Sequence, residues 1–221
     1  MEQILKTEII NILNKIQRGN APQVVNNEIT PTCIEISDYK FDLVDSEDGA
    51  PIRTFETGTA HYINGNENDT YELKIIYYDD FVHQFTFDDG NGNSRVSRLK
   101  DGVKVSDFLI YEQSASKAIF IVQELSEEDA STKIRAAKKQ LSDTLNQLYK
   151  SEVIGNFIDA FSQKLCFLSA KDNRGIVPSE GMADGFAQIY NVVPNPCPFN
   201  WGQIGRYHFS AFETSYVELI K

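Results

Sequence analysis

Three neighbouring stretches decide the fold: DFLIYE at 107–112, KAIFIVQEL at 117–125, and the helical pattern that begins near Ala130. Each of the first two has the length and the β-branched and aromatic content of a strand, and the second is apolar enough to be buried in the centre of a sheet. A few small polar residues around 114–116 separate them, which predicts a hairpin connection. We therefore expect two adjacent antiparallel strands.

The stretch that follows carries one apolar stripe at helical spacing. Its members recur every three or four positions: Ala130, Ile134, Ala137, Leu141, Leu145 and Leu148. Acidic residues at 127–129 suit the positive end of the helix dipole. A second helical stretch, at about 153–163, leads into KLCFLSAKD, which reads as another buried strand. This alternation predicts an α/β fold with a central mixed sheet flanked by helices.

The first half of the chain is β-rich after an N-terminal amphipathic helix at 2–17. We expect strands at 33–44 and 52–63, then two β-rich runs, YELKIIYYDDF and HQFTFDD, before the turn DDGNGNS, all in an antiparallel sheet. Residues 1–99 are thus interpreted as a helix and a β-rich extension of the domain, and 100–221 as its core. Within the core, 173–205 reads as a long loop rich in Gly, Pro and Asn, and one or two strands close the chain.

Composition narrows the class of protein. The formal net charge is -11, so the chain lacks the broad basic surface that extensive phosphate contact requires, and contact with nucleic acid has to be local or supplied by a partner. The three cysteines are far apart, which predicts free thiols, and the three histidines lack metal-ligand spacing. Neither a signal peptide nor an apolar run of membrane-spanning length is present, which predicts a cytoplasmic protein without a membrane partner.

The same two strands place two acidic residues near each other. In an antiparallel hairpin, Asp107 at the start of one strand lies near Glu124 at the end of the other, and Ser126 shares a face with Glu124 because it is two residues further on. Two carboxylates at one sheet edge can hold Mg²⁺ or Mn²⁺. Such an ion activates water and stabilises charge on a phosphoryl group. The sequence therefore predicts a metal site at Asp107 and Glu124.

Strand, hairpin, strand, long helix and strand, in that order, resemble the core of the PD-(D/E)xK nuclease superfamily over roughly residues 100–172. Asp107 resembles its first metal ligand and Glu124 its second, and AKKQLSDTLNQL resembles the QLxxT-like helix of many members. The resemblance implies a restriction-endonuclease-like core and a metal-dependent nuclease, in prokaryotic defence or DNA processing.

One position departs from the family pattern. Ser126 stands where the resemblance requires a lysine, and serine donates a hydrogen bond but carries no charge. A lysine on the following helix can replace it, and Lys133, which comes earlier than Lys138, is the better candidate for a catalytic role. The alternative is an inactive relative that acts as a protein-binding or structural subunit.

Simpler structural roles exist for every candidate. Asp107 can be a turn residue, Glu124 a solvated strand end, and the basic residues of the helix its exposed face. Trp201 and the aromatic residues near it can stack on bases, but packing in the core is the commoner role.

Overall fold

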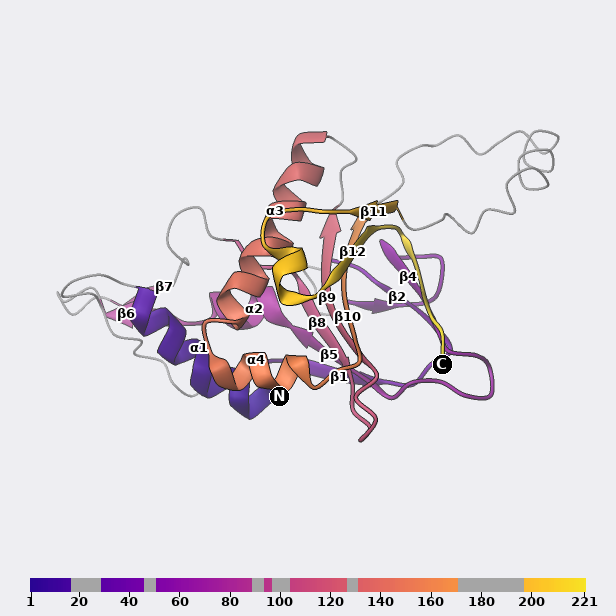
Figure 1. The fold of residues 1–221 in the computed structure, drawn as a ribbon, viewed down its shortest axis with the longest axis horizontal. Coiled ribbons are helices and arrows are strands. Elements are labelled where there is room, and N and C mark those ends of the chain that lie inside the picture. The colour runs from indigo at the N-terminus through magenta and orange to yellow at the C-terminus, as the bar shows by residue number, and fades with distance from the viewer. Residues whose placement is uncertain (17–28, 46–50, 89–93, 97–103, 127–130, 171–196) are drawn as a thin grey trace.

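The computed structural model describes residues 1–16, 29–45, 51–88, 94–96, 104–126, 131–170 and 197–221. Its centre is a seven-stranded sheet of order β1-β5-β8-β9-β10-β12-β11 (Figure 1). The strands are β1 (Cys33–Ile36), β5 (Leu73–Tyr77), β8 (Phe108–Glu112), β9 (Ile119–Ser126), β10 (Gln163–Ala170), β11 (Cys197–Phe199) and β12 (Ser210–Glu213). β8 pairs antiparallel with β9, and β9 pairs parallel with β10. The predicted α/β class with a central mixed sheet is confirmed.

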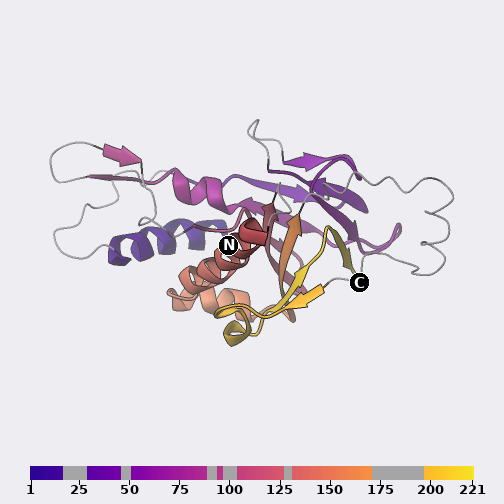
Figure 2. The same ribbon diagram turned by 90° about the horizontal axis from the view of Figure 1, so that it is seen from above.

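Helices cover one face of this sheet (Figure 2). They are α1 (Glu2–Ile16), α3 (Ser131–Leu148) and α4 (Glu152–Asp159), with the short helix η1 (Ile204–Tyr207) beside α3. The apolar stripe of α3 is buried against the sheet, and Leu141, Leu145 and Leu148 are completely inaccessible to solvent. The Ser151 hydroxyl caps α4 and also donates to Glu8 of α1. The helices predicted from apolar spacing are therefore present and form one layer.

A second sheet covers the opposite face. Its order is β13 (Tyr216–Leu219), β4 (Ala60–Asn64), β2 (Lys40–Leu43) and β3 (Ile52–Arg53). Phe41 stacks on Tyr62 with ring centroids 4.9 Å apart, and both rings are buried between the two sheets. Two short strands, β6 (Thr86–Asp88) and β7 (Ser94–Val96), pair antiparallel on either side of residues 89–93. The turn expected at DDGNGNS falls mostly on those residues, which lie outside the described part of the chain. The molecule thus has three layers: helices, large sheet and small sheet.

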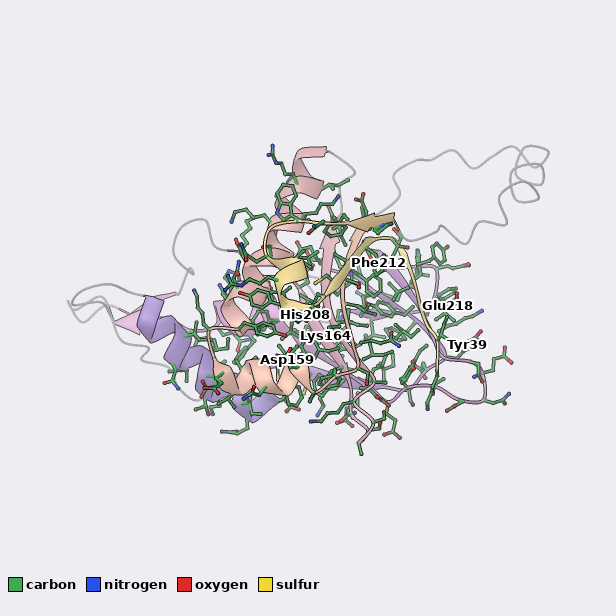
Figure 3. All side chains as sticks on the ribbon, in the orientation of Figure 1. Tyr39, Asp159, Lys164, His208, Phe212 and Glu218 are labelled. Atoms are coloured by element: carbon green, nitrogen blue, oxygen red, sulfur yellow. The ribbon has the colours of Figure 1, made fainter. Side chains whose placement is uncertain are left out.

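Side chains at the surface follow this layering. Figure 3 shows Asp159 and Lys164 beside each other at the junction of α4 and β10, where the lysine donates a hydrogen bond to the carboxylate. His208 lies close to them in the same view, and Tyr39 and Glu218 lie on the side of the small sheet. None of the helices in the described ranges combines the length and apolar character needed to cross a membrane.

Several expected boundaries were wrong. The single strand expected at 33–44 is two strands, β1 and β2, in different sheets. The strand expected at 52–63 is also two strands, β3 and β4, but both belong to the small sheet. β1 and β5 belong to the large sheet, so the β-rich half is continuous with the core. β4 also pairs parallel with β13, so the small sheet is only partly antiparallel.

Two further differences concern helices and the C-terminal part. The end of YELKIIYYDDF forms the helix α2 (Tyr78–His83). The Tyr78 N–H donates to the Asp107 carbonyl one step beyond the last β5–β8 pair, and the Asp79 N–H turns back to the same carbonyl as the helix begins. Of the expected loop at 173–205, residues 171–196 lie outside the described part, but β11 and η1 form within the rest because β12 offers β11 a pairing edge. The acidic residues at 127–129 also lie outside it.

Packing of α3 on the sheet should dominate stability. Leu145→Ala removes a completely buried side chain and should lower the free energy of unfolding by about 2–5 kcal/mol. Lys139→Ala, on the exposed face of the same helix, should change it by no more than about 0.5 kcal/mol. Urea unfolding followed by circular dichroism measures both, and equal losses would show that α3 does not pack as described.

Candidate active site

Asp107 and Glu124 lie opposite each other at one end of the β8–β9 pair. The register pairs Phe108 with Gln123. Asp107 directly precedes Phe108, the first residue of β8, and Glu124 follows Gln123 within β9. The Leu125 N–H donates to Asp107 Oδ2 at 2.6 Å, which continues the contact between the strands beyond that last pair. The structure therefore brings the two predicted carboxylates together.

The helix α3 holds the segment before Asp107. Gln140 Nε2 donates to the Val105 carbonyl at 3.2 Å, and the Ser106 N–H donates to Thr144 Oγ1 at 2.7 Å. The two polar side chains are one helical turn apart, so both face the same segment. They are the Gln and Thr of QLSDT, the part of the helix that resembles the QLxxT-like pattern. This pattern therefore fixes the start of β8, and with it the position of Asp107.

Gln123 holds the strand end that carries Glu124. Its Oε1 accepts from the Tyr62 hydroxyl at 2.6 Å, and its Nε2 donates to the Glu124 carbonyl at 2.9 Å and to Ser169 Oγ at 3.1 Å. Ser169 Oγ in turn donates to the Thr214 carbonyl at 2.7 Å. The three side chains of this network, Tyr62, Gln123 and Ser169, are buried. The network links β9, β10 and β4 behind the acid, so Glu124 sits on a rigid support.

Burial makes the charged form of both acids unfavourable. Glu124 is 3% exposed, and burial raises the pKa of its carboxyl well above the usual range. The negative charges of Asp107 and Asp79 raise this pKa further, and the positive charge of Lys104 lowers it. Burial also raises the pKa of Asp107 to about 8, against the hydrogen bond from Leu125. Both carboxyls therefore favour their protonated, neutral forms unless a positive charge lies beside them.

One oxygen of the pair is left without a partner. Glu124 Oε2 is buried and accepts no hydrogen bond from any side chain or backbone group in the described part of the chain. A cation placed against it would satisfy that oxygen and offset the repulsion between the two carboxylates. Within the described ranges no group of three or more His, Cys, Asp or Glu side chains is arranged to hold a metal ion. Two carboxylates supply fewer ligands than a hard cation takes, so a cation held here would need water for the rest of its shell.

The lysines that could supply positive charge to the site occupy different surroundings. Lys133 is exposed in the first part of α3, and Ser126, the last residue of β9, lies on the same face as Glu124. Lys138 pairs with Glu213 at 2.8 Å and lies over the Phe199 ring at 4.6 Å, so it is already engaged. Lys104 is the lysine whose charge acts on Glu124. Its position three residues before Asp107 is the signal in the sequence that could have identified it.

Sequence reasoning also missed the acids beside Asp107. A cavity of about 40 Å³ is lined by Asp45, Tyr77, Asp79, Asp80 and Asp107 together with apolar side chains. The signal was the pair of acids that follows a β-rich run in YYDD, but reading that run as a continuous strand placed them elsewhere. The helix α2 instead turns Asp79 toward the site.

The other candidates have structural roles. Phe199, Trp201 and Tyr207 pack against the helical core, and the guanidinium of Arg135 lies 5.8 Å from the centre of the Trp201 ring. Cys33 and Cys166 are free thiols, as predicted.

Comparison with known proteins does not extend this description. No protein-family model, curated protein or solved structure matches the chain.

The raised pKa values predict how stability depends on pH. Asp107 has a pKa of about 8 in the folded chain and ~4 when unfolded, so between these values the folded chain binds more protons and its stability falls as pH rises. Asp107→Asn keeps an acceptor for the Leu125 N–H and removes the titrating group. The melting temperature of this variant should fall less than that of the wild type between pH 5 and pH 8.

The control for this measurement is Asp38→Asn, which removes an exposed carboxylate from the turn between β1 and β2. Its melting curve should keep the wild-type dependence on pH. Parallel curves for the wild type and Asp107→Asn would contradict the assignment of a raised pKa to Asp107.

Proposed function

We propose that the chain is a divalent-cation-dependent phosphodiester hydrolase that acts on nucleic acid. The observation that carries this proposal is the opposition of Asp107 and Glu124 across β8 and β9, with Glu124 Oε2 buried and without a partner in the described part of the chain. A protein that needs only stability does better with apolar side chains at such positions, because a buried carboxylate without a partner is costly. Groups with strongly perturbed pKa values gather at functional sites.

The arrangement of elements supports the same class. β8, β9, α3 and β10 follow in the order on which the resemblance to the PD-(D/E)xK superfamily rests, with β8 and β9 antiparallel and β10 parallel to β9. Gln140 and Thr144, which belong to the helix pattern of that resemblance, bind the segment that carries Asp107. The pattern is thus tied to the site by hydrogen bonds.

Each side chain has a defined task in this proposal. Bound Mg²⁺ or Mn²⁺ would supply an activated water and positive charge for the phosphoryl group. Asp107 and Glu124 hold the ion, and the backbone of Leu125 and the side chain of Gln123 orient them. Lys104 adds positive charge beside Glu124, and the Ser126 hydroxyl offers a hydrogen bond on the same face.

Cation binding should be visible in stability before any activity is measured. Mg²⁺ or Mn²⁺ at about one hundred times its dissociation constant should stabilise the folded chain by about 2.7 kcal/mol, because the ion binds the folded state only. The variant with both Asp107→Asn and Glu124→Gln should lose that gain. Thermal unfolding with and without metal measures it, and a cleavage time course on single- and double-stranded DNA and RNA should show metal-dependent cleavage by the wild type alone.

An equal metal-induced shift in the wild type and the double variant would place the ion elsewhere. Cleavage that survives Glu124→Gln would show that another group, or a contaminant, does the chemistry.

A second candidate function rests on Ser126. The position that the resemblance assigns to a lysine carries no charge, which favours an inactive relative that binds protein or has a structural role. A cleavage assay of the wild type distinguishes this function from the hydrolase, because an inactive relative would cleave none of these substrates with either metal. Ser126→Lys would then be the variant that restores weak cleavage.

If the wild type is active, a lysine outside β9 must supply the charge. We expect Lys104→Ala to lower the rate by about 10²-fold, the effect of losing one preorganised electrostatic group, because its charge already acts on Glu124. From the sequence, Lys133 is the helix lysine that can replace the one missing at position 126. Lys133→Ala is therefore measured beside it, with Lys139→Ala as the control from the exposed face of α3. If only Lys133→Ala lowered the cleavage rate, Lys133 and not Lys104 would supply the positive charge.

A further inference from the structure

A pocket separate from the acidic pair lies at the β11 edge of the large sheet, where β12 and η1 meet beside α3 (Figure 1). Apolar and polar side chains line it together: Phe199, Asn200, Ile204, Phe209, Ser210 and Phe212. Its volume of about 330 Å³ falls within the range of about 300 to 1,000 Å³ that is usual for sites that hold small ligands. β10 lies between β12 and β9, so this pocket belongs to a different part of the sheet from Asp107 and Glu124.

Three phenylalanine rings give the pocket rigid walls. Phe209 is 6% exposed and contacts the Phe120 ring edge-on, with centroids 6.3 Å apart, and the Phe212 ring contacts that of Phe167 at 5.9 Å. Phe199 packs against the helical core at the end of β11. Rings held by such contacts present fixed apolar surfaces, and a planar ring that packs on them gains more than its buried area alone provides. The walls therefore favour an aromatic ligand.

Two of these rings lie beside a lysine. The Lys138 ammonium is 4.6 Å from the centre of the Phe199 ring, and the Lys164 ammonium is 5.6 Å from that of Phe209. The carboxylates that pair with these lysines are 32% and 51% exposed, so both ion pairs are weak and each lysine can also contact a further anion. In a chain of net charge -11, this concentration of lysines favours an aromatic ring with an anionic substituent over a neutral one.

Asn200 provides a hydrogen-bonding pattern at the rim of the pocket. Its side chain is exposed, and its amide offers one acceptor oxygen and two N–H donors. A Cβ placed on Gly205 would meet Asn200 Oδ1 at 3.9 Å, so the glycine leaves room beside the amide. An asparagine amide matches the N7 acceptor and amino donor on one edge of adenine. Asn200 therefore favours adenine among the aromatic rings that the walls accept.

We propose that this pocket binds an adenine nucleotide, with the base against the phenylalanine rings, Asn200 on its N7 and amino edge, and Lys138 on the phosphate. Lys138 is the more exposed of the two lysines and is therefore the better placed to contact a phosphate. A free nucleotide and an unpaired base of a single strand share this chemistry. Occupancy of the pocket does not rest on the proposed function.

The test is a calorimetric titration of the full chain with adenosine monophosphate in the presence of EDTA, which keeps the proposed cation site empty. The wild type should bind the nucleotide, and Gly205→Leu should abolish measurable binding, because the added side chain occupies the pocket. Gly205→Ala adds only a methyl group in ordinary contact with Asn200 and should bind as the wild type does. The fluorescence of Trp201, the one tryptophan of the chain and the neighbour of Asn200, reports the same binding locally.

Two further variants test the contacts to the base and to the phosphate. The wild type should prefer adenosine monophosphate over guanosine monophosphate by about tenfold, and Asn200→Leu should remove that preference. Lys138→Gln should weaken the binding of adenosine monophosphate by about tenfold and leave that of adenosine unchanged, because only the nucleotide carries a phosphate. Lys139→Gln, on the exposed face of α3, is the control. The melting temperature of each variant without ligand shows whether it folds.

A single-stranded oligoadenylate distinguishes the two sources of the ligand. If it binds more tightly than adenosine monophosphate and Gly205→Leu weakens it, the pocket holds a base of a strand; if the mononucleotide binds more tightly, the pocket holds a free nucleotide. A wild type that binds no adenine compound, or binding that Gly205→Leu leaves unchanged, would overturn the proposal. Neither result bears on the cation site, because metal-induced stabilisation at Asp107 and Glu124 is measured separately.

Discussion

The register of β8 against β9 places two carboxylates opposite each other in a poorly solvated position, and the surrounding structure has to offset the free energy that this costs. Burial opposes ionisation of both groups, and each negative charge opposes the other. The Leu125 N–H and the charge of Lys104 offset only part of this, because Glu124 Oε2 accepts no bond from the described residues. A bound cation would offset the rest of this cost. The two buried carboxylates, which lower the stability of the folded chain, are therefore also the groups that mark this end of the sheet as a candidate site.

Rigid contacts from both sides of the sheet hold this unfavourable arrangement in place. On the helical side, Gln140 and Thr144 fix the segment before β8. On the other side, Gln123 accepts a hydrogen bond from the Tyr62 hydroxyl of the small sheet and donates one to Ser169 of β10. Groups held this way cannot move apart to relieve repulsion, which is what a preorganised site requires. The small sheet contributes neither carboxylate of the pair, but through Tyr62 it helps to hold Glu124 in position.

The sequence predicted the elements whose signal is local. The strands at 107–125, the helix stripe from Ala130 and the strand after it depend on apolar spacing, and the opposition of Asp107 and Glu124 follows from hairpin geometry alone. The helix α2 was not predictable in this way, because Tyr77 and Tyr78 favour a strand equally and the deciding contact is a carbonyl far along the chain, that of Asp107. Because α2 was not predicted, the position of Asp79 beside Asp107 and the cavity between them were not predicted either. A side chain on a helix is directed differently from one at the same position of a strand.

The acidity of the chain bears on how a polyanionic substrate could be held. At a net charge of -11, nucleic acid is repelled at long range, and some of the basic side chains of α3 are neutralised within the chain, Lys138 by Glu213 and Lys139 by Asp143. Few phosphate contacts are then available from the protein itself. A cation bound at Asp107 and Glu124 would make the local charge more positive where a phosphate has to approach, because a bound divalent ion is often the largest charge in its site. Under the proposed function, the two carboxylates would accept an anionic substrate beside them only with a cation bound, so substrate binding would depend on cation binding.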